Sequence, residues 1–197
     1  MNIIVLHNNY TREALSNHEP SCYTLPETAV QKNGKPVFLP DYANPAGVEL
    51  HLALRISRLG RHISPRFAHR YYDAVTAMPH FFAPELLEQA TAQGLPWSMA
   101  MGFDTALPVG EFVPLPDQAD KGIDFLLSLD GTPTIKGNSL QLLVDFDQAI
   151  ARVSQFFTLR RGDWLLMGGP QTSLRIEPNH RIETFINEQC VSAFNVK

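Results

Sequence analysis

Glu49 and His51 are the residues whose types and spacing first suggest chemistry. They lie in the stretch GVELHLALRI, residues 47–56, where apolar side chains alternate with other residues. An alternation of period two predicts a strand with one buried face, so the carboxylate and the imidazole should share the opposite face. Both groups are metal ligands, and a strand holds them at a fixed spacing. The alternative is an ordinary polar face on an exposed antiparallel strand.

Length and composition predict a soluble globular protein. The chain has 197 residues, 44% of them hydrophobic and 18% charged, with a formal net charge of −4. The few basic clusters, at residues 55–66 and 160–161, lie among apolar residues, so the dense basic surface of a nucleic-acid-binding protein is not expected. No apolar run approaches the length of a membrane span, and the opening IIVL is too short for a signal-peptide core. Only Cys22 and Cys190 are present, which favours free thiols in a reducing cytoplasm.

The elements that must position Glu49 and His51 are mostly short strands. A buried strand is predicted over residues 3–6, followed by a short helix over 11–17. Residues 21–35 are polar and irregular, and by composition they are the segment most expected to be mobile. A helix over 84–94 has proline in its first turn and glycine at its end. Asp-Gly at 130–131 predicts a hairpin between strands at 123–129 and 132–136.

The second half of the chain continues this pattern. Asp145 and Gln148 resemble a capping box, and apolar residues then recur at helical spacing to Phe157. Further strands are predicted at 164–167, 181–187 and 191–196, whereas residues 66–77 fit a helix or a strand. Many strands and few helices, with 15 prolines, predict an α+β, mainly β fold. We expect one domain over residues 1–197, with a strand-helix-loop segment of about 1–45 packed on it.

Three stretches in order carry a family resemblance. They are the strand around Glu49; GFDT at 102–105 with PVG at 108–110; and SQFFTLRRGD at 154–163 with GGP at 168–170. They are similar to the E-x-E strand, K-G-F-D-T with P-x-G, and S-x-x-x-T-L-x-x-G-D with T-G-T-P of the fumarylacetoacetate hydrolase family. The chain thus resembles, over roughly residues 1–197, a family of metal-dependent enzymes that act on 2-oxo acids and related diketo acids. Matches in order are more specific than any single motif.

The resemblance implies a mixed β-roll with a few short helices, assembled as a homodimer that binds a small-molecule carboxylate. Family members place Mg²⁺ or Mn²⁺ on two glutamates and an aspartate, because these ions prefer oxygen ligands. The metal orients the 2-oxo-carboxylate and stabilises an enolate. The reactions implied are C–C bond hydrolysis, decarboxylation or isomerisation.

The metal positions of the family fall here on Glu49, His51 and His80. One carboxylate with two imidazoles suits Fe²⁺, Mn²⁺ or Zn²⁺ better than Mg²⁺. Alternatively, the two histidines fill space or bond to backbone groups. The remaining histidines show no metal-ligand spacing and are predicted to be ordinary surface or core residues; they are His7, His18, His62, His69 and His180.

Other functional positions of the family have also changed. The family's H-x-x-E pair falls on Glu13 and Ser16, so Glu13 is a candidate general base, or else an exposed helix glutamate. At two positions near the substrate, Met101 replaces the lysine before G-F-D and Gly169 replaces the threonine of T-G-T-P. Three hypotheses follow: an enzyme of the family type, a silent member that binds a small molecule or protein, or an enzyme whose metal and reaction have both changed.

Overall fold

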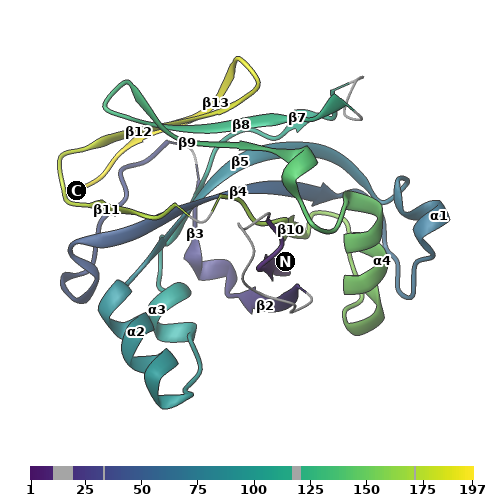
Figure 1. Cartoon of the computed structure of the whole chain (residues 1–197), viewed down its shortest axis with the longest axis horizontal. Helices are drawn as coiled ribbons and strands as arrows, with labels where there is room; N and C mark the ends of the chain where they lie inside the picture. The colour runs from purple at the N-terminus through teal and green to yellow at the C-terminus, as the bar shows by residue number, and fades with distance from the viewer. Residues whose placement is uncertain (11–19, 33, 117–120, 171) are drawn as a thin grey trace.

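Two long antiparallel strands form the centre of the structure. The computed structural model describes residues 1–10, 20–32, 34–116, 121–170 and 172–197. Strand β4 (Ala46–Ile56) pairs with β5 (Tyr72–Phe82), with Glu49 directly opposite His80. The alternating pattern predicted one buried face, but β4 is buried on both faces except at Glu49 and Arg55. The reason is that β4 is an interior strand of its sheet, and the other elements cover it from both sides (Figure 1).

The largest sheet among the described residues has seven strands and mixed direction. Its order is β2-β1-β10-β4-β5-β7, and β11 also pairs with β4. The remaining strands are β1 (Ile3–His7), β2 (Ser21–Leu25), β7 (Val113–Pro114), β10 (Trp164–Leu166) and β11 (Leu174–Ile176). The pair β1 and β10 is parallel, whereas the other pairs are antiparallel. This mixed sheet brings the start of the chain beside residues 164–166.

A second, four-stranded sheet lies over β5 and β4 (Figure 1). It contains β8 (Asp124–Leu129), β9 (Thr132–Asn138), β12 (Arg181–Ile186) and β13 (Gln189–Asn195). The predicted Asp130-Gly131 turn joins β8 to β9, with φ of 50° and 79° at its two residues. A smaller sheet pairs β3 (Val30–Lys32) with β6 (Leu107–Val109). The mainly β fold is therefore confirmed.

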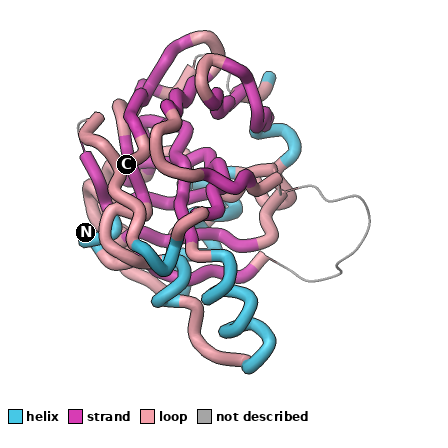
Figure 2. Tube along the Cα trace, turned by 90° about the vertical axis from the view of Figure 1, so that its left-hand side faces the viewer, coloured by secondary structure: helices cyan, strands magenta, loops and turns pink. Residues whose placement is uncertain are grey.

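The helices of the described residues are few and lie at the periphery of the strands (Figures 1 and 2). They are α1 (Pro65–Ala68), α2 (Pro84–Gln93), α3 (Ser98–Met101) and α4 (Phe146–Phe156), with 3-10 turns at Glu27–Ala29, Asp41–Ala43 and Ser139–Gln141. Helix α4 begins as predicted, because the Asp145 carboxylate accepts a hydrogen bond from the Gln148 amide at 2.8 Å. Helix α2 ends at Gly94, whose φ of 65° favours glycine.

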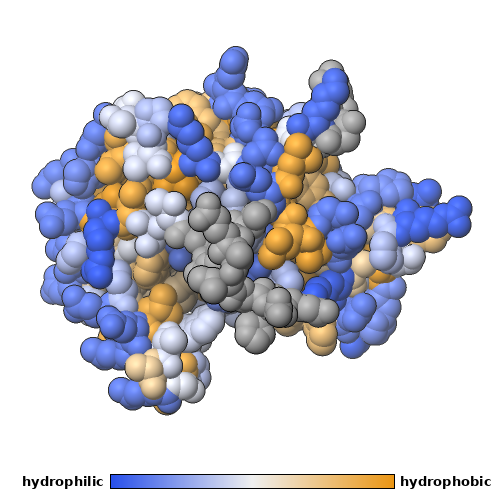
Figure 3. All heavy atoms as spheres, viewed as in Figure 1, coloured by the Kyte–Doolittle hydropathy of each residue, from blue (hydrophilic) through white to orange (hydrophobic). Residues whose placement is uncertain are grey.

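Residues 21–35 differ from their predicted irregular structure. They contain β2 and β3, and β2 pairs with β1 along all five of its residues. Strand β2 is an edge strand with few buried side chains, so its sequence lacks a clear alternation. The predicted helix over 11–17 lies outside the described residues. Hydrophilic residues cover most of the outline in Figure 3, and none of the described helices could cross a membrane.

Candidate functional site

Glu49, His51 and His80 lie together at the centre of the large sheet. Glu49 and His51 are two residues apart on β4, and His80 faces Glu49 from β5. His51 Nε2 is 3.6 Å from Glu49 Oε2, and the rings of His51 and His80 are 5.7 Å apart between centroids. The structure therefore brings the three residues suggested as metal ligands into one neighbourhood.

His80 is fully buried and has a defined tautomer. Its Nε2 lies 2.7 Å from the carbonyl oxygen of Met101. A carbonyl only accepts hydrogen bonds, so Nε2 carries the proton and Nδ1 carries the lone pair. That Nδ1 has no hydrogen-bond partner. Burial, followed by the charge of His51, lowers the pKa of His80 to about 4, so the ring is neutral at pH 7.

His51 is buried and neither of its ring nitrogens has a hydrogen-bond partner. The 3.6 Å to Glu49 is too long for a hydrogen bond. A buried polar atom without a partner costs free energy and calls for a ligand, ion or water at that point. Burial alone would raise the pKa of the Glu49 carboxyl, but His51, His80 and His7 more than offset this and lower it. Glu49 is thus an anion beside two buried ring nitrogens that lack partners.

A polar cavity of about 310 Å³ opens beside Glu49 and His51. The end of β1 and residues 168–170 complete its wall. Leu52 donates its amide to the carbonyl of Gly168 at 3.1 Å, which holds the Gly168-Gly169 segment against β4. A Cβ added at Gly169 would lie 1.8 Å from the Leu50 carbonyl oxygen, so the backbone as it stands excludes the threonine of the family motif. Gly169 therefore lines the cavity with backbone alone.

The types of donor atom at this site suit a divalent ion, but the side chains are not yet positioned to hold one. Two ligands of one ion, each about 2.1 Å away, lie roughly 3 Å apart, so the 3.6 Å between Glu49 and His51 requires only a small shift. The Nδ1 lone pair of His80 is a third donor without a partner. Within the described part of the chain, however, no three His, Cys, Asp or Glu side chains are arranged to hold an ion. Binding would require these side chains to converge.

His7, which was predicted to be an ordinary surface or core residue, also lines this cavity. It is the last residue of β1, it lines the cavity with Glu49, and its charge lowers the pKa of Glu49. Its ring lies 5.2 Å from that of Trp97 and 6.5 Å from that of Tyr23, between centroids. Burial, and then the charge of Glu49, raises the pKa of Tyr23. No sequence spacing links these rings, because they come from β1, β2 and the turn before α3.

A second cavity has a volume of about 670 Å³. Tyr23 and Trp97 line it, together with Met101. Met101, suggested above as a substrate-binding position, is buried and has two roles at the site: its carbonyl oxygen fixes His80, and the residue lines this cavity. Glu13 and Ser16 lie outside the described residues.

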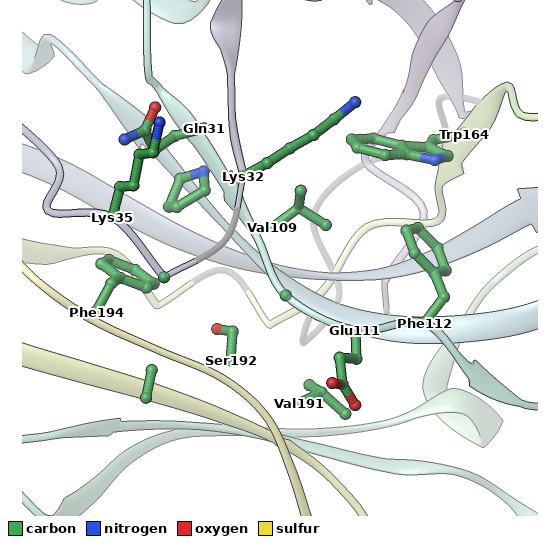
Figure 4. A pocket seen from close by; sticks show the side chains of 14 residues that line it. Gln31, Lys32, Lys35, Val109, Glu111, Phe112, Trp164, Val191, Ser192 and Phe194 are labelled. Atoms are coloured by element: carbon green, nitrogen blue, oxygen red, sulfur yellow. The ribbon is translucent and has the colours of Figure 1, made fainter.

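A third cavity, of about 450 Å³, lies where the three sheets meet (Figure 4). Lys32 and Lys35 extend along one wall, and Trp164 and Phe112 lie at one end, with their rings 5.4 Å apart between centroids. Among its described lining residues, Glu111 alone is of the His, Cys, Asp and Glu types. The described lining of this cavity therefore offers cations but no cluster of metal ligands.

Comparisons with known proteins agree with this architecture. Residues 5–195 match the model of the fumarylacetoacetate (FAA) hydrolase C-terminal family. The mitochondrial oxaloacetate tautomerase of Mus musculus is 29% identical over 182 residues, which cover 91% of this chain and 81% of the relative. The mitochondrial oxaloacetate decarboxylase of Dictyostelium discoideum is 28% identical over 188 residues, 92% of this chain and 86% of that protein.

Solved structures give the same result for the fold. A fumarylacetoacetate hydrolase family protein from Yersinia pestis superposes with a TM-score of 0.90 at 26% identity, covering 100% of this chain and 92% of the other. Fumarylpyruvate hydrolase from Pseudomonas aeruginosa, in complex with Mn²⁺ and pyruvate, gives a TM-score of 0.90 at 19% identity, with coverages of 100% and 89%. The second likeness concerns the fold alone.

Proposed function

We propose, from the premise that this chain belongs to the fumarylacetoacetate hydrolase family, that it is an enzyme acting on a 2-oxo acid. The family relatives matched here act on oxo acids, which supports this class of substrate. We further propose that a divalent ion, held by Glu49, His51 and His80, participates in the reaction. The observation that carries the proposal is the pair of buried imidazoles with unpartnered nitrogens beside the Glu49 carboxylate.

Each residue of the site contributes a separate property. Glu49 supplies the negative charge, since its lowered pKa keeps it ionised at neutral pH. His80 supplies a lone pair in a fixed direction, because Met101 holds its other nitrogen. His51 supplies a buried nitrogen that faces no competing partner. A bound ion would polarise the 2-oxo-carboxylate, and two imidazoles favour Fe²⁺, Mn²⁺ or Zn²⁺ over Mg²⁺.

Proton transfer is assigned to Glu13 in this proposal. The support is the family resemblance alone, because Glu13 lies outside the described residues. Replacing its carboxylate by an amide, Glu13→Gln, should abolish turnover while leaving the melting temperature unchanged. An unchanged rate would remove Glu13 from the mechanism.

The second candidate function is a catalytically silent scaffold that binds a small molecule or a protein. Met101 in place of the family lysine favours it, since a thioether offers neither charge nor a proton. The lack of three converging ligands among the described residues also favours it. For either function we propose a single domain that assembles as a cytoplasmic homodimer. The two free cysteines are compatible with a reducing compartment.

Metal analysis and turnover assays separate the two functions. Protein without a histidine tag is assayed for bound metal, then for turnover of oxaloacetate and an acylpyruvate with Mg²⁺, Mn²⁺ or Fe²⁺. Turnover with any ion, lost in Glu49→Gln and retained in the control Glu111→Gln, supports the enzyme. Turnover only with Mn²⁺ or Fe²⁺ supports the changed ligand set. Absence of both metal and turnover in folded protein supports the scaffold.

A further inference from the structure

The two cavities at the site contain no lysine or arginine among their described lining residues. The polar cavity is lined by Leu6, His7, Asn8, Asn9, Tyr10, Glu49, Leu50, His51, Gly168, Gly169 and Pro170. Its formal anion is Glu49. A ligand that carries two carboxylates would therefore place its second carboxylate near one anion and no permanent cation. Burial of an unpaired carboxylate is costly, so the described lining disfavours a dicarboxylate.

The second cavity has no charged side chain among the described residues that line it. Most of its lining is apolar, and it includes the aromatic residues Tyr23, Trp97 and Phe157. Such walls match a flat apolar group, which contributes binding energy through the area it buries. Its volume of about 670 Å³ lies within the usual range of small-molecule sites.

The ring of His7 brings the linings of the two cavities into contact. His7 lines the polar cavity, and its ring contacts Trp97 and Tyr23, which line the apolar one. The rings of Tyr23 and Trp97 are themselves 6.1 Å apart between centroids, with planes at 77°. The polar end of a ligand beside Glu49 and His51 thus lies next to an aromatic wall.

We propose that the substrate is a 2-oxo monocarboxylic acid with an apolar, aromatic-sized substituent, and not a dicarboxylate such as oxaloacetate. This inference rests on the proposed function. The oxo-acid end binds beside Glu49 and His51, and the substituent lies against Trp97 and Tyr23. The lysines of the third cavity, Lys32 and Lys35, line a different hollow and leave this selectivity unchanged (Figure 4).

Calorimetric binding of three probes in the presence of Mn²⁺ tests the proposal. The probes are pyruvate, 2-oxo-4-phenylbutanoate and 2-oxoglutarate, which share the oxo-acid end and differ in the rest. We expect the phenyl compound to bind at least about tenfold more tightly than 2-oxoglutarate, because its ring is buried in the apolar cavity. Equal or weaker binding of the phenyl compound, alongside measurable binding of the other two, overturns this inference alone. Failure of all three to bind overturns the proposed function as well.

Two variants assign the preference to the cavity. Trp97→Ala should reduce the preference for 2-oxo-4-phenylbutanoate over 2-oxoglutarate, measured as the ratio of their dissociation constants, to about threefold or less. The control Trp164→Phe, which alters the third cavity, should leave this ratio unchanged. Met101→Lys adds a cation to a residue that lines the apolar cavity and should shift the preference toward 2-oxoglutarate. Melting curves establish that each variant is folded. A ratio that neither Trp97→Ala nor Met101→Lys changes overturns the inference.

Discussion

Protonation of His80 should make the unfolding free energy of this protein depend on pH between 7.5 and 5. Its pKa is 6.5 in the unfolded chain and about 4 in the folded one, chiefly because the ring is buried. Below pH 6.5 the unfolded chain therefore binds a proton that the folded chain does not. The stabilisation is complete above pH 6.5 and is lost as the pH falls toward 4.

The size of the effect follows from these two pKa values. Between pH 7.5 and pH 5, linkage gives a loss of about 2 kcal/mol from His80 alone. Glu49 is an acid, and its pKa is lowered from 4.5 in the folded protein. Its contribution to the unfolding free energy is also lost as the pH falls, but only below about 4.5. Its contribution thus lies outside this window.

Urea unfolding of chelator-treated protein at several pH values measures this loss, because a bound ion would compete with the proton. His80→Gln removes the titrating ring and should have a shallower dependence on pH, although its unfolding free energy is lower throughout. The difference between wild type and variant cancels the histidines that lie away from this site, since they are common to both. A difference that stays constant from pH 7.5 to 5 would refute the argument from burial.

Three further predictions concern single residues. Gly169→Ala should lower the unfolding free energy by roughly 3 kcal/mol, because its Cβ would lie 1.8 Å from the Leu50 carbonyl oxygen. The control Gly94→Ala, whose Cβ meets nothing within 4 Å, should cost about 1 kcal/mol. Equal costs in urea unfolding would contradict this prediction. Asp163→Asn should lower the unfolding free energy by about 1–3 kcal/mol, because the buried carboxylate accepts hydrogen bonds from the Asn2 amide, the Asn2 side chain and the Arg160 amide. The control Asp104→Asn, at an exposed residue, should leave it nearly unchanged in the same assay. Glu49→Gln should weaken Mn²⁺ binding at least about tenfold by calorimetry, and an unchanged affinity would place the ion elsewhere.

The sequence predicted what depends on local periodicity. The alternation around Glu49 and His51 predicted their common face, and the structure has their side chains 3.6 Å apart. The Asp130-Gly131 hairpin and the cap at Asp145 follow from short-range turn and capping preferences, and both are confirmed. The suggested metal and substrate roles remain predictions.

The features that were not predicted depend on tertiary contacts. His7 reaches Glu49 only because β1 and β4 lie in one sheet, and Trp97 reaches His7 from the turn before α3. The burial of His51 depends on the neighbours of β4 and not on its own sequence. The need for glycine at position 169 comes from the close approach of its backbone to the Leu50 carbonyl oxygen. None of these contacts leaves a periodic signal in the sequence.

The parallel pairing of β1 with β10 has a consequence for the order of folding. Ile3 pairs with Trp164, and the Asn2 amide reaches Asp163 across a separation of 161 residues. Closing so long a loop costs chain entropy, and such non-local pairings slow folding. On the ribosome, β1 can pair with β2 early but must wait for β10 until most of the chain has been made. The polar cavity needs the end of β1, β4 and residues 168–170 at once, so it is complete only in the nearly full-length, folded protein.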